Sequence, residues 1–248
     1  MTRTWPYAGV VAHRGGGSLA PENTLAAFET GARLGFKLAE CDVKRSGDGV
    51  LFLLHDDTVD RTSNGHGAAA ALTYDEIAGF DAGTWLDATF AGERMPTLTD
   101  LAQLLERLDM RVNLEIKPSP GEDAQTGSGV ATEASRLWRG RTPPLLSSFS
   151  DDALAAARDA VPELPRGLLI TSVPTDWRER AQRLECESIH VAHTSLDEGT
   201  VRAFKDAGLF VMAYTVNDIE RARILAQWGV DAICTDRLDA IGPAWHFE

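Results

Sequence analysis

The 248-residue sequence predicts an α/β fold of the (β/α)8 type, known as the TIM barrel, with a small insertion after the third strand. Short runs rich in Val, Ile and Leu, typical of buried strands, alternate along the chain with amphipathic segments of helical length. This alternation favours a parallel sheet covered by helices, and the chain length suits a closed barrel. We expect one domain over residues 1–248, with no linker and no internal repeat.

Nine apolar runs are strand candidates, which is one more than the barrel needs. Only six residues separate the second run from the third, fewer than the dozen or so that a parallel crossover requires. These two runs are therefore expected to form a hairpin that brings His55 near Glu40. The nine runs are residues 10–13, 38–43, 50–55, 112–117, 145–149, 166–170, 188–192, 209–215 and 231–235.

Helix boundaries are predicted from capping residues and glycines. Residues 23–35 carry apolar side chains on one face and end at a glycine, and residues 99–109 have leucines at helical spacing. Two later segments begin at Ser195 and Asn217, each followed three positions on by Glu, and both end at a glycine.

The stretch from about 57 to 96 contains no convincing strand and is rich in Gly, Ala and Asp. Long insertions at a barrel mouth usually serve function. We therefore expect this insertion to cover the mouth of the barrel.

Composition excludes several classes of protein. The formal charge of -13, from 37 acidic and 24 basic residues, repels nucleic acid and anionic membranes, so we expect neither as a stable partner. Three cysteines without a CxxC pair favour a reducing compartment. Neither a signal peptide nor an apolar run of about 20 residues is recognisable, so we expect a cytoplasmic protein.

Charged residues are concentrated near the ends of two candidate strands. Alternation along a strand places Glu40 and Asp42 on one face, and Glu115 and Lys117 repeat this arrangement. Taken alone, Glu40 and Asp42 could simply be residues at a strand end that reach solvent. In a barrel, however, inward residues at these ends converge, so the three carboxylates could hold one hard cation, Mg²⁺ or Ca²⁺.

Two histidines end apolar runs at equivalent places. His13 is followed by Arg14 and three glycines, which suggest an anion such as phosphate, and His55 is followed by two Asp residues. A single histidine in such a place is more often structural. A pair of imidazoles can instead supply the base and the acid that phosphodiester hydrolysis needs.

In order along residues 10–236, the motifs resemble those of the glycerophosphodiester phosphodiesterases, a family with a phosphatidylinositol-phospholipase-C-like TIM barrel. These motifs are His13-Arg14-Gly15, Pro21-Glu22-Asn23-Thr24, Glu40-Cys41-Asp42, Asp48-Gly49, His55-Asp56, Arg61-Thr62, Pro96-Thr97-Leu98, Glu115-Ile116-Lys117, Ser147-Ser148-Phe149, Tyr214-Thr215-Val216-Asn217 and Thr235-Asp236.

The resemblance implies metal-dependent hydrolysis of a small glycerophosphodiester to sn-glycerol 3-phosphate and an alcohol. It implies that His13 and His55 act as general acid and base. One divalent cation, Mg²⁺ or Ca²⁺, would be held by Glu40, Asp42 and Glu115.

The remaining expected site residues contact the substrate. These are Arg14 and Lys117 at the phosphate, with Glu22, Phe149 and Tyr214. Tyr214 stands where the family usually has Trp. Asn23 is expected to shape and cap the following helix, and Asp236 to orient Lys117 or another charged group.

Three alternatives remain at this stage. A lysophospholipase-D-like or sphingomyelinase-like enzyme would keep the same ligands but would need an apolar groove or a membrane anchor. An enolase-type enzyme would not need two histidines at separate strand ends, and a non-catalytic phosphate-ligand-binding barrel would not need the whole set. The sequence leaves the head group, the choice of cation and the oligomeric state open.

Overall fold

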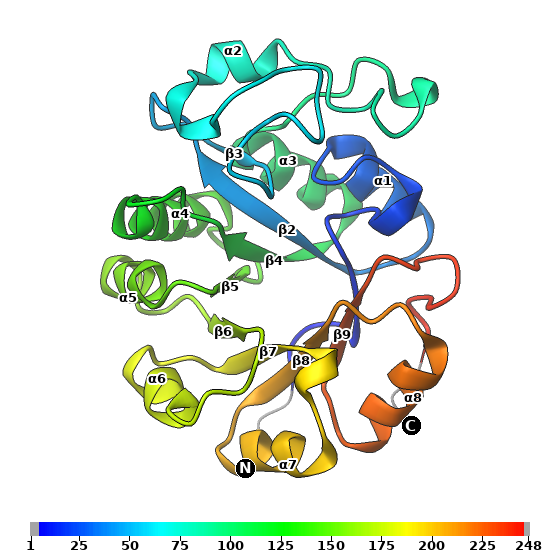
Figure 1. The fold of residues 1–248 in the computed structure, drawn as a ribbon, viewed down its shortest axis with the longest axis vertical. Helices are drawn as coiled ribbons and strands as arrows, with labels where there is room; N and C mark the ends of the chain where they lie inside the picture. Colours follow the sequence, from blue (N-terminus) through cyan, green and yellow to red (C-terminus); the bar gives the residue numbers. More distant parts are fainter. Residues whose placement is uncertain (1–4, 246–248) are drawn as a thin grey trace.

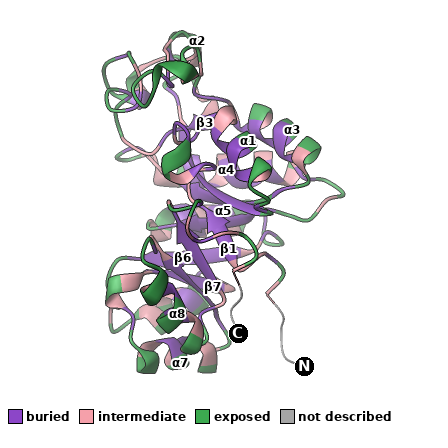
Figure 2. Cartoon of the chain, turned by 90° about the vertical axis from the view of Figure 1, so that its right-hand side faces the viewer, coloured by how far each residue is buried: buried purple, intermediate pink, exposed green. Residues whose placement is uncertain are grey.

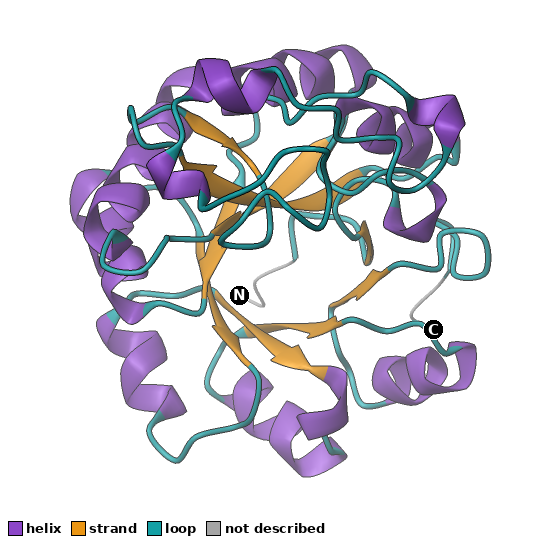
Figure 3. Cartoon of the chain, turned by 45° about the horizontal axis from the view of Figure 1, so that its top comes forward, coloured by secondary structure: helices purple, strands orange, loops and turns teal. Residues whose placement is uncertain are grey.

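In the computed structural model, which describes residues 5–245, eight parallel strands close into a barrel (Figure 1). Each strand pairs with the next around the ring, and β1 pairs with both β2 and β9 to close it. Figure 3 shows the helices outside this ring of strands. The strands are β1 (Val10–Ala12), β2 (Leu38–Arg45), β3 (Leu51–Leu53), β4 (Arg111–Ile116), β5 (Leu145–Ser148), β6 (Arg166–Ile170), β7 (Ser188–Ala192), β8 (Phe210–Tyr214) and β9 (Ala232–Thr235).

The predicted (β/α)8 fold is confirmed, and so is the predicted hairpin. Strand β3 lies antiparallel to β2, with Leu53 opposite Val43 and Leu51 opposite Arg45. It stands outside the ring of parallel strands. Residues 1–4 and 246–248 of the expected domain lie outside the described residues.

Capping side chains define where the helices begin. Thr24 accepts a hydrogen bond from the Ala27 amide and caps α1. Asp197 and Asp218 cap α7 and α8, so the predicted starts at Ser195 and Asn217 are wrong. In each case an aspartate just downstream supplies the acceptor. The helices are α1 (Leu25–Arg33), α2 (Tyr74–Ala78), α3 (Leu98–Leu108), α4 (Asp123–Leu137), α5 (Asp151–Ala160), α6 (Trp177–Arg183), α7 (Glu198–Asp206) and α8 (Ile219–Gln227).

The core has an outer and an inner part. The outer part lies between the strands and the helices, and Figure 2 shows buried strands beneath helices whose outer faces are exposed. The inner part closes the barrel near the amino ends of its strands, with Val11, Leu38, Leu145, Met212 and Ala232. Polar inward residues are therefore left to the carboxyl ends of the strands, where a TIM barrel places its site.

The insertion over residues 57–96 contains α2 and packs on the hairpin (Figure 1, top). A small separate core joins Val59, Ile77 and Met95 of the insertion to Phe52 and Leu54. Its apolar side chains are thus used against β3, whereas Arg61 of the same insertion reaches Glu22 and Asp56 beside the barrel mouth.

Two further findings bear on the sequence-based expectations. In the described part of the chain, no helix combines the length and the apolar character needed to cross a bilayer. The three cysteines, all within that part, are free thiols.

Candidate active site

A pocket of about 170 Å³ opens at the carboxyl ends of the barrel strands. It brings together most of the residues expected from the sequence. Those that line it are His13, Arg14, Glu40, His55, Glu115, Lys117, Phe149 and Tyr214, joined by inward residues such as Asn113, Leu169, His190 and Met212. Asp42 is not among the lining residues, but it forms ion pairs with Arg14 and Lys117, which are.

Three buried carboxylates form the charged centre of the pocket. Glu40 and Asp42 project from β2, and Glu115 lies beside Asp42 in the register of β4. An oxygen from each of the three lies within 4.8 Å of the others. Burial and the neighbouring Asp42 charge raise the pKa of Glu40 to about 8 and that of Glu115 to about 7. Burial also acts to raise the pKa of Asp42, but the charges of Lys117 and Arg14 outweigh it and lower that pKa.

This donor set is a possible cation site. Three close carboxylates offer only oxygen ligands, and hard divalent cations prefer such ligands. Burial and shared negative charge raise the pKa values of Glu40 and Glu115, and a bound cation would favour their charged forms. A second group, His13, Glu40 and Cys234, is also close enough to bind a metal, but burial raises the pKa of the Cys234 thiol and keeps it protonated.

Arg14 and Lys117 neutralise part of this charge. The Arg14 side chain lies 3.4 Å from Asp42 and 2.6 Å from Glu22. The backbone amide of Arg14 donates a hydrogen bond to Glu40. Arg14 has φ at 50°, a left-handed conformation that a non-glycine residue rarely adopts. Lys117 Nζ lies 2.6 Å from Glu115 and 3.5 Å from Asp42. Both basic side chains thus line the pocket beside the carboxylates.

His13 is held by a carboxylate from the last strand. Its Nδ1 lies 2.5 Å from Asp236, which also accepts a hydrogen bond from Asn217. Burial disfavours the charged imidazole, yet the Asp236 hydrogen bond and Glu40 raise the pKa of His13 above its ordinary value. Asp236 was expected to orient Lys117 or another charged group at the mouth, and the group that it contacts is His13.

His55 is held by a longer chain of charged groups. Its Nδ1 lies 2.7 Å from Asp56, and Arg61 donates to both oxygens of Asp56 at 2.6 and 3.1 Å. Arg61 also donates to both oxygens of Glu22, at 2.7 and 2.8 Å, and Glu22 in turn binds Arg14. One guanidinium from the insertion therefore ties His55 to Arg14. Burial and the charges of Arg14 and Lys117 lower the pKa of His55, although Asp42 and Asp56 oppose them.

Sequence reasoning assigned no role to Asp56 or Arg61, although both stand in the motifs quoted above. The signal that could have identified Asp56 as a partner of His55 was its position directly after that histidine. Glu22 lies between two guanidinium groups and is not among the residues that line the pocket.

Asn23 is not the helix cap expected from the sequence. Its side-chain amide donates to Asp42 at 2.9 Å, and the Asp42 backbone amide donates to Asn23 Oδ1 at 3.2 Å. Asn23 has φ at 59°, which asparagine tolerates better than most residues, and this turns its side chain toward β2. Thr24 is the cap instead.

The glycines after Arg14 serve packing rather than ligand approach. A Cβ on Gly15 would lie 2.9 Å from the Phe28 amide, and one on Gly17 would lie 2.3 Å from the Asp236 carbonyl oxygen. These positions let the loop fit against α1 and the end of β9. Neither glycine is among the residues that line the pocket.

Two aromatic rings border the pocket. Phe149, which is 41% exposed, meets Tyr214 edge-on at 6.1 Å, and Lys117 Nζ lies 5.6 Å from the Phe149 ring centre. The Tyr214 hydroxyl donates to the Ile170 carbonyl, which fixes that ring. Phe149 is therefore the more accessible apolar surface of the pair.

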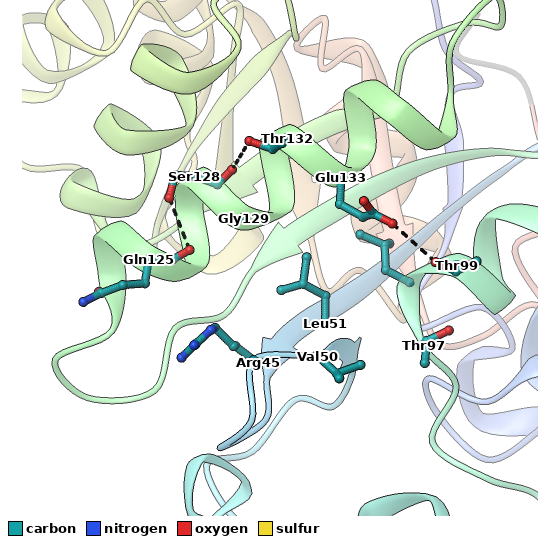
Figure 4. A pocket seen from close by; sticks show the side chains of 12 residues that line it. Arg45, Val50, Leu51, Thr97, Thr99, Gln125, Ser128, Gly129, Thr132 and Glu133 are labelled. Atoms are coloured by element: carbon teal, nitrogen blue, oxygen red, sulfur yellow. Dashed lines mark hydrogen bonds between the residues drawn. The ribbon is translucent and has the colours of Figure 1, made fainter. Parts of the chain in front are cut away.

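A larger hollow, about 620 Å³, lies outside the barrel between α4 and the β2–β3 hairpin (Figure 4). Its charged lining residues, Arg45 and Glu133, are already paired with Glu122 and Arg136. Ser128 and Thr132 donate to carbonyls of their own helix. This hollow therefore offers none of the chemistry found at the strand ends.

A TIM barrel with a cluster of three carboxylates and carboxylate-paired histidines at its strand ends has the parts of a phosphodiester-cleaving enzyme. The model of the glycerophosphoryl diester phosphodiesterase family matches residues 13–240. The chain belongs to this family and is an enzyme of that class.

Relatives support the assignment over nearly the whole chain. A glycerophosphodiester phosphodiesterase of Caldanaerobacter subterraneus is 35% identical over 92% of this chain and 93% of its own length. A phosphodiesterase of Oleispira antarctica, solved with the product sn-glycerol-3-phosphate, is 35% identical, covers 93% of both chains and superposes with a TM-score of 0.90. A glycerophosphodiester phosphodiesterase of Agrobacterium tumefaciens is 29% identical, covers 94% of this chain and 97% of its own, and has a TM-score of 0.76.

Proposed function

We propose that this protein hydrolyses small glycerophosphodiesters to sn-glycerol 3-phosphate and an alcohol, with one bound divalent cation and two catalytic histidines. One observation carries the proposal: three carboxylates, two basic side chains and two carboxylate-paired histidines lie together at one pocket. Membership of the family and the product bound by the Oleispira relative support the same substrate class.

Arg14 and Lys117 bind the phosphate in this proposal. A phosphodiester anion repels an attacking oxygen, so its charge must be neutralised before bond formation. Glu40, Asp42 and Glu115 would hold Mg²⁺ or Ca²⁺, which would supply further positive charge to the phosphate oxygens. Phe149 and Tyr214 would contact the substrate beside the phosphate.

The two histidines transfer the protons. Because Asp236 and Asp56 bind the Nδ1 atoms of His13 and His55, the Nε2 atoms remain for exchange with the substrate. One imidazole accepts the proton of the attacking oxygen, and the other donates a proton to the leaving alcohol. The attacking oxygen belongs either to water or to the 2-hydroxyl of the glycerol, and the second route passes through a cyclic phosphate.

The proposed setting is the cytoplasm, with a small molecule as the partner. Free Cys41, Cys186 and Cys234 suit a reducing compartment. The net charge of -13 opposes binding to nucleic acid or to an anionic membrane.

The test is phosphorus NMR of glycerophosphocholine and glycerophosphoethanolamine incubated with the purified protein and either Mg²⁺ or Ca²⁺. We expect the resonance of sn-glycerol 3-phosphate to appear. A transient resonance of a five-membered cyclic phosphate would establish attack by the 2-hydroxyl, and its absence under rapid quenching would support attack by water. Cleavage of lysophosphatidylcholine in preference to both substrates would replace the proposal with a lysophospholipase-D-like activity.

A further inference from the structure

The inner end of the pocket contains two buried polar side chains that the proposed chemistry does not use. Asn113 on β4 and His190 on β7 line the pocket and are 2% and 1% exposed. Asn113 lies beside Glu40 in the strand register, so this inner end adjoins the carboxylates. His190 lies between Leu169 and Met212 in the register, and both of these neighbours are apolar.

His190 has hydrogen-bonding capacity that the barrel does not satisfy. Its Nε2 lies 2.9 Å from Ser188 Oγ, and no partner for Nδ1 is found within residues 5–245. Burial lowers the pKa of His190 to about 3, so the ring is neutral near pH 7 and offers one donor and one acceptor. A buried histidine with a purely structural role normally has both nitrogens paired.

The strand next to His190 makes room for its ring. A Cβ on Gly167 of β6 would lie 2.6 Å from His190 Nε2 and 2.6 Å from Ser188 Oγ. Any side chain at this position would displace the imidazole from the barrel interior. The space at Gly167 therefore places a polar ring where a barrel normally packs branched apolar side chains.

Asn113 has unused capacity as well. Its Oδ1 is buried and has no partner among the described residues. Its amide carries an acceptor at one end and two donors at the other, and rotation about the last side-chain bond decides which end meets the pocket. Asn113 and His190 thus present neutral donors and acceptors to the same space.

The pocket volume limits what can occupy this end. At about 170 Å³ the pocket is smaller than the cavities that hold drug-sized ligands. A three-carbon polyol with its phosphate suits this volume, whereas a complete phosphodiester with its head group must extend past the mouth. There the exposed Phe149 ring meets the solvent.

We propose that Asn113 and His190 form a subsite that binds the hydroxyl groups of the glycerol moiety, while the leaving alcohol projects through the mouth. This inference rests on the proposed function and adds the direction in which the substrate enters. Hydrogen bonds to neutral hydroxyl groups would use the free hydrogen-bonding capacity of these two uncharged side chains. The enzyme would then select for glycerol and tolerate different alcohols.

The test compares a substrate that has glycerol hydroxyls with one that has none. The kcat/KM of His190→Phe and Asn113→Leu is measured with glycerophosphocholine and with bis(4-nitrophenyl) phosphate. Asn113→Leu keeps the number of side-chain heavy atoms and His190→Phe adds one, and both remove the hydrogen-bonding groups. We expect each to lower kcat/KM at least tenfold with glycerophosphocholine and less than threefold with bis(4-nitrophenyl) phosphate, on the order of the cost of lost hydroxyl recognition.

Thr126→Val is the matched control, because Thr126 Oγ1 on α4 is also buried without a partner among the described residues but lies outside the barrel and does not line the pocket. It should leave both activities within twofold. Equal losses with both substrates in the two variants would overturn the subsite and indicate a structural role. If the wild-type protein cleaves only bis(4-nitrophenyl) phosphate, the proposed function itself fails and the subsite fails with it.

A binding measurement covers the case in which a variant is inactive or unstable. Calorimetric titration of the wild-type protein should give at least tenfold tighter binding of sn-glycerol 3-phosphate than of inorganic phosphate. His190→Phe should reduce this ratio toward one, and His190→Gln, which retains hydrogen-bonding groups, should keep part of it. The same ratio in all three proteins would contradict the proposal.

Discussion

The two ends of one pocket are built from different chemistry. At the mouth, charged side chains are paired with one another, as in the chain from His55 through Asp56, Arg61 and Glu22 to Arg14. At the inner end, His190 is neutral and only partly hydrogen-bonded. In our proposal the charged residues act on the phosphate and the neutral inner residues bind the glycerol hydroxyls, so mutations in the two groups should have different signatures.

The largest effect is expected from the carboxylates at the mouth. Glu115→Gln removes a charge from the possible cation site, and loss of metal assistance is worth several kcal/mol, or about 10³-fold in kcat. Glu133→Gln on α4, where Glu133 pairs with Arg136, is the control and should be neutral. Steady-state kinetics with saturating cation measure both, and a Glu115→Gln enzyme of normal activity would remove this residue from the proposed cation site.

The histidines at the mouth come next. His13→Ala and His55→Ala should each lower kcat by at least about 10², the usual contribution of general acid or base catalysis. His66→Ala is the control and should keep normal turnover, because the His66 side chain is 85% exposed and binds only Asp60 among the described residues. Near-normal turnover in either of the first two variants would refute the role proposed for that histidine.

At the inner end, His190 should make stability depend on pH. Its folded pKa of about 3 lies below the ordinary value of 6.5, so well above pH 6.5 neither the folded nor the unfolded state is protonated and stability is full. As the pH falls below 6.5, the unfolded chain binds a proton that the folded protein does not. Between pH 7 and pH 5 this costs about 2 kcal/mol of unfolding free energy. Urea unfolding should show His190→Gln losing less stability over this range than the wild type, and identical losses would contradict a neutral buried ring.

The smallest effect is expected at Arg61, which positions other groups. Arg61→Gln releases Asp56 and Glu22 together, and small misplacements of His55 and Arg14 should lower kcat/KM about tenfold. Arg94→Gln, in the same insertion and bound to the Phe80 carbonyl, should have no effect. Partial recovery in Arg61→Lys would support a positioning role, whereas wild-type kinetics in Arg61→Gln would show that the chain of ion pairs is dispensable.

The strands and the possible cation site were predictable because both follow from local rules. Alternation along a strand put Glu40 and Asp42 on one face, and the short link before β3 required a hairpin. A barrel then gathers the ends of its strands at one mouth, which placed Glu115 beside Asp42.

The partners of the histidines were not predictable in the same way. Arg61 reaches Glu22 across 39 residues of sequence, and Asp236 reaches His13 across 223, so only the folded loops bring them together. Asn23 faces Asp42 because its backbone is left-handed, which spacing alone does not reveal. The place of His190 in the pocket depends on the space at Gly167 of the neighbouring strand.

The central claim is that the charged mouth binds a cation and cleaves glycerophosphodiesters. The most direct measurement is release of sn-glycerol 3-phosphate from glycerophosphocholine by the purified protein, first as isolated, then in EDTA, and then with Mg²⁺ or Ca²⁺ restored. Our account predicts that EDTA abolishes release and that one of the two cations restores it. Undiminished release in EDTA, or no release with either cation, would contradict it.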